Sequence, residues 1–300
     1  MVGVSGYYHM TLTTTISCSN EKTNVVYAHM TEKFIHKKSL GQHFLTSDYA
    51  PKKMCDAANL VAGDIVLEIG PGTGILTKEI LARSAKVIAI EADVRAIDAL
   101  QETFPSEIAS GQLTIHHHDA RKLQVSDFGL RHLEFKVVAN IPYYLSGFLF
   151  RNLLDTDCQP NTLVFLIQKE VAQRIARDPK ESLLALSIKV FGDPTYICTV
   201  KRGHFTPPPK IDSAIVAVSN ISRDRFVGVN ADTFFKIIHL GFAQKRKQLL
   251  GNLAATYGRD QVTTILTELN LPLTIRAEDI SIDSWLLLVP KLSTVTKQLV

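Results

Sequence analysis

The stretch EIGPGTG, residues 68–74, decides the fold of this chain. It overlaps the end of an apolar run over 65–69 and precedes a segment with helical spacing that begins after Gly74. Glycines at such a strand-to-helix turn allow the backbone to approach a ligand closely. Their spacing here is GxGxG, whereas dinucleotide-binding domains use GxGxxG. A glycine triplet alone is a weak signal, so its meaning depends on the residues that follow it.

Strand-like apolar runs alternate with helical patterns along the chain from this turn onward. The strand-like runs cover residues 65–69, 86–91, 113–118, 135–140 and 163–168. The helical patterns follow Gly74, cover 93–103, begin near 146 and cover 169–177. This alternation predicts an α/β domain with a doubly wound, Rossmann-like parallel sheet that helices cover on both faces. Two later runs, 194–200 and 213–219, are separated by Gly203 and three prolines, which predicts an antiparallel end to the sheet.

The chain divides by composition into four parts. Residues 1–29 are rich in Thr, Ser and Asn, lack the pattern of a signal peptide, and are expected to be a disordered extension. Residues 30–221 form the α/β domain. Residues 231–293 show helical spacing only, which predicts a small helical domain over 222–293, and 294–300 is expected to be a tail. No apolar run approaches the roughly 20 residues of a membrane span, so we expect a soluble protein without a membrane partner.

Net charge and cysteine usage narrow the possible classes of protein only slightly. The 300 residues carry a net charge of +4 with a pI near 8.8, which is compatible with a nucleic-acid partner. The cysteines lack metal-type spacing and indicate reduced thiols in a cytoplasmic protein: Cys18, Cys55, Cys158 and Cys198. Three consecutive histidines, His116 to His118, cannot all bind one ion from a strand, because neighbouring side chains point to opposite faces. We therefore expect no metal site.

Three of the predicted strands end in, or are followed by, a polar residue at the edge of the sheet where a ligand is expected. Glu91, Asp119 and Asn140 each follow or end an apolar run. In an open α/β sheet the ligand lies beyond the carboxyl ends of the strands, so these residues and Gly70 are expected to converge on one crevice. There Glu91 can accept the hydroxyls of a ribose, and Asp119 can accept a hydrogen bond from an adenine amine. Helix capping is the alternative role for each acid taken singly.

The stretch NIPYY, residues 140–144, has the chemistry needed to hold a second adenine. The Asn140 side-chain oxygen and the Ile141 carbonyl can accept the two amine protons and direct the nitrogen lone pair at an electrophile. Pro142 sets the chain direction, and the ring of Tyr143 offers a face for base stacking. The alternative is a simple turn with core aromatics.

The chain resembles the ribosomal RNA adenine dimethyltransferases, in particular the bacterial small-subunit (16S) dimethyladenosine transferases. The matching pieces occur in the order of that family over roughly residues 33–290: KKSLGQHFL (37–45), LEIGPGTGILT (67–77), AIEAD (89–93), HHDA (117–120), NIPYYLS (140–146), LIQKEVAQRI (166–175), HFTPPPKIDSAIV (204–216), GFAQKRKQL (241–249) and RAEDIS (276–281). The resemblance implies a class I methyltransferase that uses S-adenosylmethionine. It further implies dimethylation of two adjacent adenosines in a hairpin near the 3′ end of 16S rRNA, as a step in small-subunit biogenesis.

The resemblance also assigns roles to individual residues. The cofactor-binding positions are His43, Leu45, Gly70, Gly72, Gly74, Glu91, Asp119 and Asn140, and the catalytic, base-facing positions are Asn140, Ile141, Pro142, Tyr143 and Phe205. The family often has Asn at the position of His43, so the contact made there is expected to differ. Basic residues that can neutralise RNA phosphates are Lys37 and Lys38, with Lys33 nearby, and Lys245, Arg246 and Lys247 on the helical domain. A solvated helix face is the alternative for these clusters.

Three other functions remain open from the residues alone. The branch that methylates large-subunit rRNA shares the glycine turn and NIPY, although HFTPPPKIDS and GFAQKRKQL favour the small-subunit branch. A nicotinamide-dependent oxidoreductase predicts GxGxxG and does not need NIPY. A ribosome-assembly factor without catalysis could keep the same fold. For the favoured enzyme we expect a cytoplasmic monomer whose partner is the small ribosomal subunit.

Overall fold

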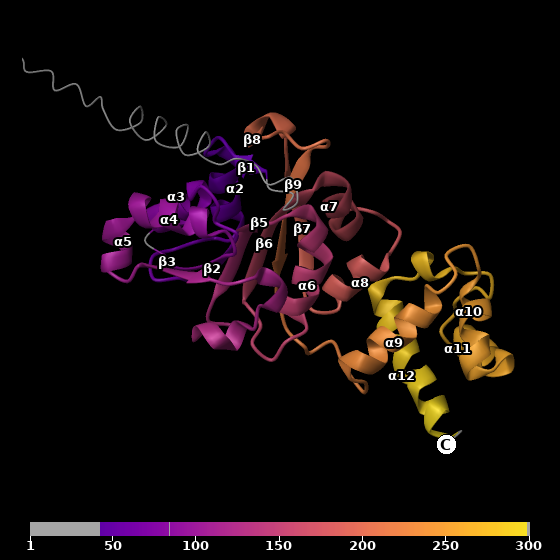
Figure 1. The fold of residues 1–300 in the computed structure, drawn as a ribbon. Helices are drawn as coiled ribbons and strands as arrows, with labels where there is room; N and C mark the ends of the chain where they lie inside the picture. The colour runs from indigo at the N-terminus through magenta and orange to yellow at the C-terminus, as the bar shows by residue number, and fades with distance from the viewer. Residues whose placement is uncertain (1–42, 84, 299–300) are drawn as a thin grey trace, which may run out of the picture.

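The computed structural model describes residues 43–83 and 85–298. Figure 1 shows an α/β part, from β1 to β9, and a group of helices, α9 to α12, that lies to one side of it. The expectations for residues 1–29 and for Lys33, Lys37 and Lys38 lie outside the described residues. No helix in the described part is long and apolar enough to cross a bilayer.

A seven-stranded sheet in the described residues forms the centre of the α/β part, with strand order β4-β3-β2-β5-β6-β9-β7. The strands are β2 (Ile65–Ile69), β3 (Lys86–Glu91), β4 (Leu113–His117), β5 (Lys136–Asn140), β6 (Thr162–Gln168), β7 (Asp193–Val200) and β9 (Ser213–Ser219). Strands β2 to β6 pair in parallel, whereas β9 lies between β6 and β7 and is antiparallel to both. The parallel sheet and its antiparallel end agree with the sequence pattern.

Helices cover both faces of this sheet, as the periodicity predicts. One face packs against α2 (Tyr49–Ala57), α3 (Ile75–Ala82) and α4 (Val94–Thr103), and the other against α6 (Ser146–Leu154), α7 (Lys169–Ala176) and α8 (Leu183–Lys189). Side chains of β5 alternate between the two faces: Val138 packs in the core beneath α2, α3 and α4, whereas Val137 and Ala139 pack in the core beneath α6, α7 and α8. A short helix, α5 (Pro105–Ala109), leads into β4. The sequence pattern does not predict helices α2, α5 and α8.

The helical group contains α9 (Ala231–Gly241), α10 (Leu249–Tyr257), α11 (Arg259–Glu268) and α12 (Ile282–Gln298). Its core is continuous with that of one sheet face, since Trp285 and Phe234 belong to the same buried cluster as Phe191. The last helix continues past the boundary expected at residue 293 and ends at Gln298, with Pro290 inside it.

A separate two-stranded sheet joins the first described strand to the connection between β7 and β9. Strand β1 (Phe44–Leu45) pairs antiparallel with β8 (Phe205–Thr206), and Thr46 donates to the carbonyl of His204 at 2.9 Å. This pairing was not foreseen, because two-residue strands give no periodicity. It brings His43 to the carboxyl edge of the large sheet.

Candidate active site

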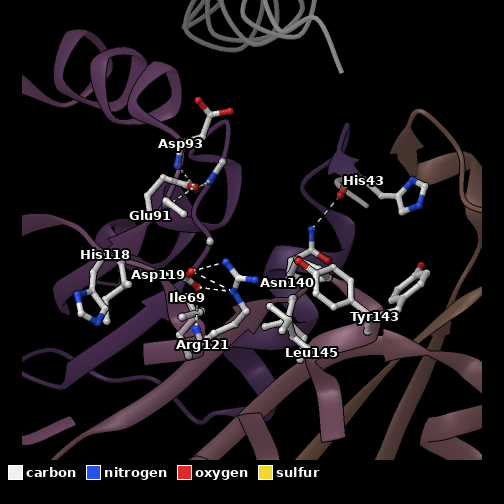
Figure 2. Close-up of a pocket in the computed structure, with 18 of the residues that line it drawn as sticks. His43, Ile69, Glu91, Asp93, His118, Asp119, Arg121, Asn140, Tyr143 and Leu145 are labelled. Atoms are coloured by element: carbon white, nitrogen blue, oxygen red, sulfur yellow. Dashed lines mark hydrogen bonds and ion pairs between the residues drawn. The ribbon is translucent and has the colours of Figure 1, made fainter. Parts of the chain in front are cut away.

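A cavity of about 320 Å³ opens at the carboxyl ends of strands β2 to β5 (Figure 2). Of the residues assigned to the cofactor or the base, it is lined by His43, Gly70, Gly72, Glu91, Asp119, Asn140, Ile141, Pro142 and Tyr143. Their elements are neighbours in the sheet, and parallel strands present their carboxyl ends at one edge. The convergence expected from the sequence is therefore present in the structure.

The glycine turn is shaped for close approach. Gly70, Gly72 and Gly74 have φ angles of 69°, 56° and 77°, in the left-handed region that favours glycine. A Cβ built at Gly70 meets no atom within 4 Å, so the turn leaves free space at a residue that lines the cavity. The Gly70 N–H itself donates to the Ile90 carbonyl at 2.9 Å, which ties the turn to β3.

Gly74 has a packing role that differs from that of the other two glycines. It does not line the cavity; it caps α3, and a Cβ there would lie 2.7 Å from the Phe104 ring and 2.8 Å from Leu100. Its small size is required for packing between α3 and α4. Leu45 is also displaced from the main cavity: it is buried and lines a smaller one beside the turn, together with Glu68 and Asn140.

Glu91 is held by the backbone around it. Its Oε1 accepts from the N–H groups of Ala92 and Asp93 at 2.8 and 2.9 Å, and its Oε2 accepts from Gly72 at 3.2 Å. Burial raises the pKa of this carboxyl, and the three N–H donors oppose that shift. A carboxylate has about four lone-pair positions, so one on Oε2 remains for a ligand hydroxyl.

Asp119 is paired with Arg121, which the sequence had not singled out. The guanidinium contacts both carboxylate oxygens at 2.6–3.0 Å, and the Arg121 N–H donates to Oδ1 at 2.9 Å. These hydrogen bonds lower the pKa of Asp119 to about 2. Figure 2 shows Arg121 between Asp119 and Asn140. Such an exposed pair is worth about 0–1 kcal/mol, so a ligand amine can displace it at small cost.

Asn140 is oriented by the segment that β1 brings to the edge. Its Nδ2 donates to the His43 carbonyl at 3.2 Å, and among the described residues its Oδ1 accepts no hydrogen bond. The amide is thus fixed with its acceptor end unused. His43 makes this contact with its backbone carbonyl, so the contact does not depend on having His where the family often has Asn.

Tyr143 is fixed on two sides. Its hydroxyl lies 2.6 Å from that of Ser213, and its ring stacks against the His43 ring with centroids 5.8 Å apart. The His43 Nδ1 in turn lies 2.8 Å from the Pro207 carbonyl oxygen. The next residue, Tyr144, also lines the cavity and is 62% exposed, although only its place in NIPYY pointed to it.

The structure does not bring every assigned residue to the cavity. Phe205 is 3% exposed and packs in the core with α2, because the β1–β8 pairing turns it inward. Lys245, Arg246 and Lys247 are exposed in the turn between α9 and α10. In the part of the chain that is described, no group of three His, Cys, Asp or Glu side chains is placed to hold a metal.

The residues at the cavity fit S-adenosylmethionine. The free space at Gly70 fits a contact between the ligand and the backbone. The remaining acceptor position of Glu91 fits a ribose hydroxyl, and the displaceable ion pair at Asp119 fits an adenine amine. The sheet, its antiparallel last strands and this edge site are those of a class I methyltransferase.

Comparison with known proteins gives the family. The model of the ribosomal RNA adenine dimethylase family matches residues 33–293. Ribosomal RNA small subunit methyltransferase A of Dehalococcoides mccartyi is 37% identical over 255 residues, 84% of this chain and 87% of the relative. The protein of that name from Crocosphaera subtropica is 37% identical over 267 residues, 84% of this chain and 96% of the relative. The chain therefore belongs to the ribosomal RNA adenine dimethylase family and is an S-adenosylmethionine-dependent rRNA (adenine-N6) dimethyltransferase.

Solved structures agree with the fold. A dimethyladenosine transferase from Plasmodium falciparum superposes with a TM-score of 0.69 at 27% identity, covering 85% of this chain and 98% of that one. The 23S rRNA methyltransferase ErmE gives a TM-score of 0.66 at 22% identity, covering 83% of this chain and 99% of that one, which shows the shared fold. Membership of the ribosomal RNA adenine dimethylase family sets aside the nicotinamide-dependent alternative.

Proposed function

We propose that this enzyme dimethylates two adjacent adenosines in a hairpin near the 3′ end of 16S rRNA, within the small ribosomal subunit and as a step in its biogenesis. The observation that carries the chemistry is Asn140, whose amide nitrogen is bound by the His43 carbonyl while its oxygen faces no protein donor in the described chain. The names of the relatives, small subunit methyltransferase A, support the choice of particle.

The cofactor would be held by the residues at the edges of β2, β3 and β4. Gly70 and Gly72 offer backbone to the methionine portion, Glu91 accepts from the ribose, and Asp119 accepts from the adenine amine after Arg121 has moved aside. Once bound, S-adenosylmethionine would supply the electrophilic methyl group of its sulfonium, whose S–CH3 bond breaks so that S-adenosylhomocysteine leaves. The remaining chemistry belongs to the side chains that hold the target base.

The target adenine would lie against Tyr143 with its amine at Asn140. The Asn140 Oδ1 and the Ile141 carbonyl accept the two amine protons, which favours a pyramidal nitrogen with its lone pair directed at the methyl group. The nitrogen gains the methyl and then releases one proton to water, so no protein base is needed. One N–H remains for a single acceptor before the second transfer.

The helical group fits a role in docking on the particle. Its exposed cations Lys245, Arg246 and Lys247 can neutralise phosphates of rRNA outside the hairpin. The favoured setting is the cytoplasm, with the enzyme acting as a monomer on the small subunit.

Labelled transfer tests this function. The purified protein is incubated with methyl-labelled S-adenosylmethionine and unmethylated small subunits, large subunits or naked 16S rRNA, and the RNA is digested to nucleosides. We expect dimethyladenosine mainly in small subunits. Label confined to large-subunit RNA would assign the enzyme to the other branch. Tight binding to small subunits without any label would leave an assembly factor.

The variant Asn140→Ala separates catalysis from assembly. We expect it to lose methyl transfer by at least roughly a hundredfold, as for removal of a key transition-state contact, and to keep binding to small subunits. An equal loss of both would contradict the assignment of Asn140 to the chemistry.

A further inference from the structure

A second pocket, of about 600 Å³, lies at the same edge of the sheet beyond the base site and is built mainly from charged side chains. The described residues that line it are Lys169, Glu170, Lys201, Arg202, Lys210, Ile211 and Asp212. Four are cations and two are carboxylates, so the pocket is basic. None of the residues assigned to the cofactor or to the target base lines it.

The strand order places this pocket next to the target base. From Asn140 at the end of β5, the edge continues to β6, which Lys169 follows, then to the start of β9, and then to the end of β7, which Lys201 follows. The Lys169 N–H donates to the Asp212 carbonyl at 3.0 Å, which joins the two loops. Strands are about 5 Å apart, so the pocket lies roughly 5–15 Å from Asn140 along the edge.

A hydrogen bond also connects the pocket loop to the base site. Asp212 lines the pocket, and the next residue, Ser213, lies 2.6 Å from the hydroxyl of Tyr143. The loop that shapes the pocket therefore also holds the ring proposed to stack on the adenine.

The charges in the pocket are only partly balanced by the protein. Asp212 accepts from the Lys201 ammonium at 2.9 Å and from the Arg202 N–H at 3.0 Å. The Lys201 contact helps to lower the pKa of Asp212, so this carboxylate stays ionised. Among the described residues, no carboxylate pairs with Lys169, Lys210 or the Arg202 guanidinium. Arg202 and Lys210 are exposed and free to meet an anion.

We propose that this pocket binds a phosphodiester group of the RNA next to the target adenosine, with Arg202 and Lys210 as the main contacts. A guanidinium can bind phosphate with two hydrogen bonds, and a second cation reinforces it. Such a contact holds the strand while the base is turned toward Asn140, because phosphate contacts set the register of a nucleic acid. The proposal rests on the proposed function, since it names how that substrate is held.

The test compares Arg202→Ala/Lys210→Ala with wild type and with the control Lys86→Ala. Lys86 is an exposed lysine at the amino end of β3, on the opposite edge of the sheet. Binding of 16S rRNA is measured against salt concentration, KM and kcat are measured with small subunits, and the Kd for S-adenosylmethionine checks that the fold is intact. A second variant, Arg202→Lys, keeps the charge.

We expect the double variant to raise the KM for the particle roughly tenfold and to make the plot of log affinity against log salt less steep by about 1–2. Its Kd for S-adenosylmethionine and the behaviour of Lys86→Ala should match wild type. Arg202→Lys should keep the salt slope of wild type but only part of its affinity, because an ammonium cannot make the two parallel hydrogen bonds of a guanidinium.

An unchanged salt slope and KM in the double variant would overturn the phosphate site. So would normal affinity for naked rRNA combined with weak binding to intact subunits, because that pattern indicates an acidic protein contact. Failure of the wild type to methylate small subunits would instead refute the proposed function, and the salt dependence of RNA binding would still report on the pocket.

Discussion

The hydroxyl of Tyr143 lies 2.6 Å from the hydroxyl of Ser213, although 70 positions separate the two residues in the chain. Ser213 is fully buried at the start of β9, and Tyr143 lines the cavity after β5. With the His43 ring on its other side, the tyrosine has little rotational freedom. The ring face proposed to stack on the adenine is therefore positioned by β9, a strand with no residue among those that line the described cavity.

Removal of that hydrogen bond is expected to reduce turnover without affecting the cofactor. Ser213→Ala should lower kcat roughly fivefold, since a hydrogen bond contributes about 1 kcal/mol, and the Kd for S-adenosylmethionine should stay unchanged. Tyr143→Phe removes the other partner and should give a similar loss, and the double variant should be no worse than either. Additive losses would show that the two hydroxyls act separately.

Replacement of Glu91 should affect cofactor binding first. In Glu91→Gln the new amide group faces at least one of the N–H donors from Gly72, Ala92 and Asp93, so a hydrogen bond is lost and the turn shifts. We expect the Kd for S-adenosylmethionine to rise roughly ten- to a hundredfold, since bonds to charged groups are worth about 1.5–3 kcal/mol. Calorimetry measures this directly, and an unchanged Kd would remove Glu91 from the cofactor site.

Glu68 should make stability depend on pH. Burial raises its pKa from 4.5 to about 8, Thr77 donates to its Oε2 at 2.7 Å, and its Oε1 has no partner in the described chain. The folded state holds this proton while the unfolded state releases it near pH 4.5. The contribution of Glu68 to the free energy of unfolding is therefore fully present below about pH 4.5 and is lost as the pH rises to about 8.

The variant Glu68→Gln removes this titration. Chemical denaturation at pH 5, 6.5 and 8 should show that the free energy of unfolding of wild type falls relative to the variant as pH rises. A constant difference between the two proteins across this range would show that Glu68 is ionised in the folded state.

Two glycines in the same turn should respond differently to substitution. Gly74→Ala combines a positive φ with contacts at 2.7 and 2.8 Å to Phe104 and Leu100, so we expect a loss of about 2–4 kcal/mol in the free energy of unfolding. Gly70→Ala meets no neighbour and should lose roughly 1–2 kcal/mol from its backbone conformation alone. It should also weaken cofactor binding more than Gly74→Ala does. Denaturation and cofactor titration of both variants test this contrast, and equal stability losses would refute it.

The sequence by itself determined the alternation of strands and helices, the parallel sheet with an antiparallel end, the glycine turn and the polar residues at the carboxyl edge. Local periodicity reports whether a strand is buried, and parallel strands bring their carboxyl ends to one edge, so the sequence predicts that Glu91, Asp119 and Asn140 lie together. Only the tertiary structure decided the contacts between distant segments. The β1–β8 pairing buries Phe205, Arg121 folds back over Asp119, Ser213 meets Tyr143, and the loops after β6 and β7 gather the basic pocket. These depend on register and loop packing, which short segments far apart in the chain do not encode in any local pattern.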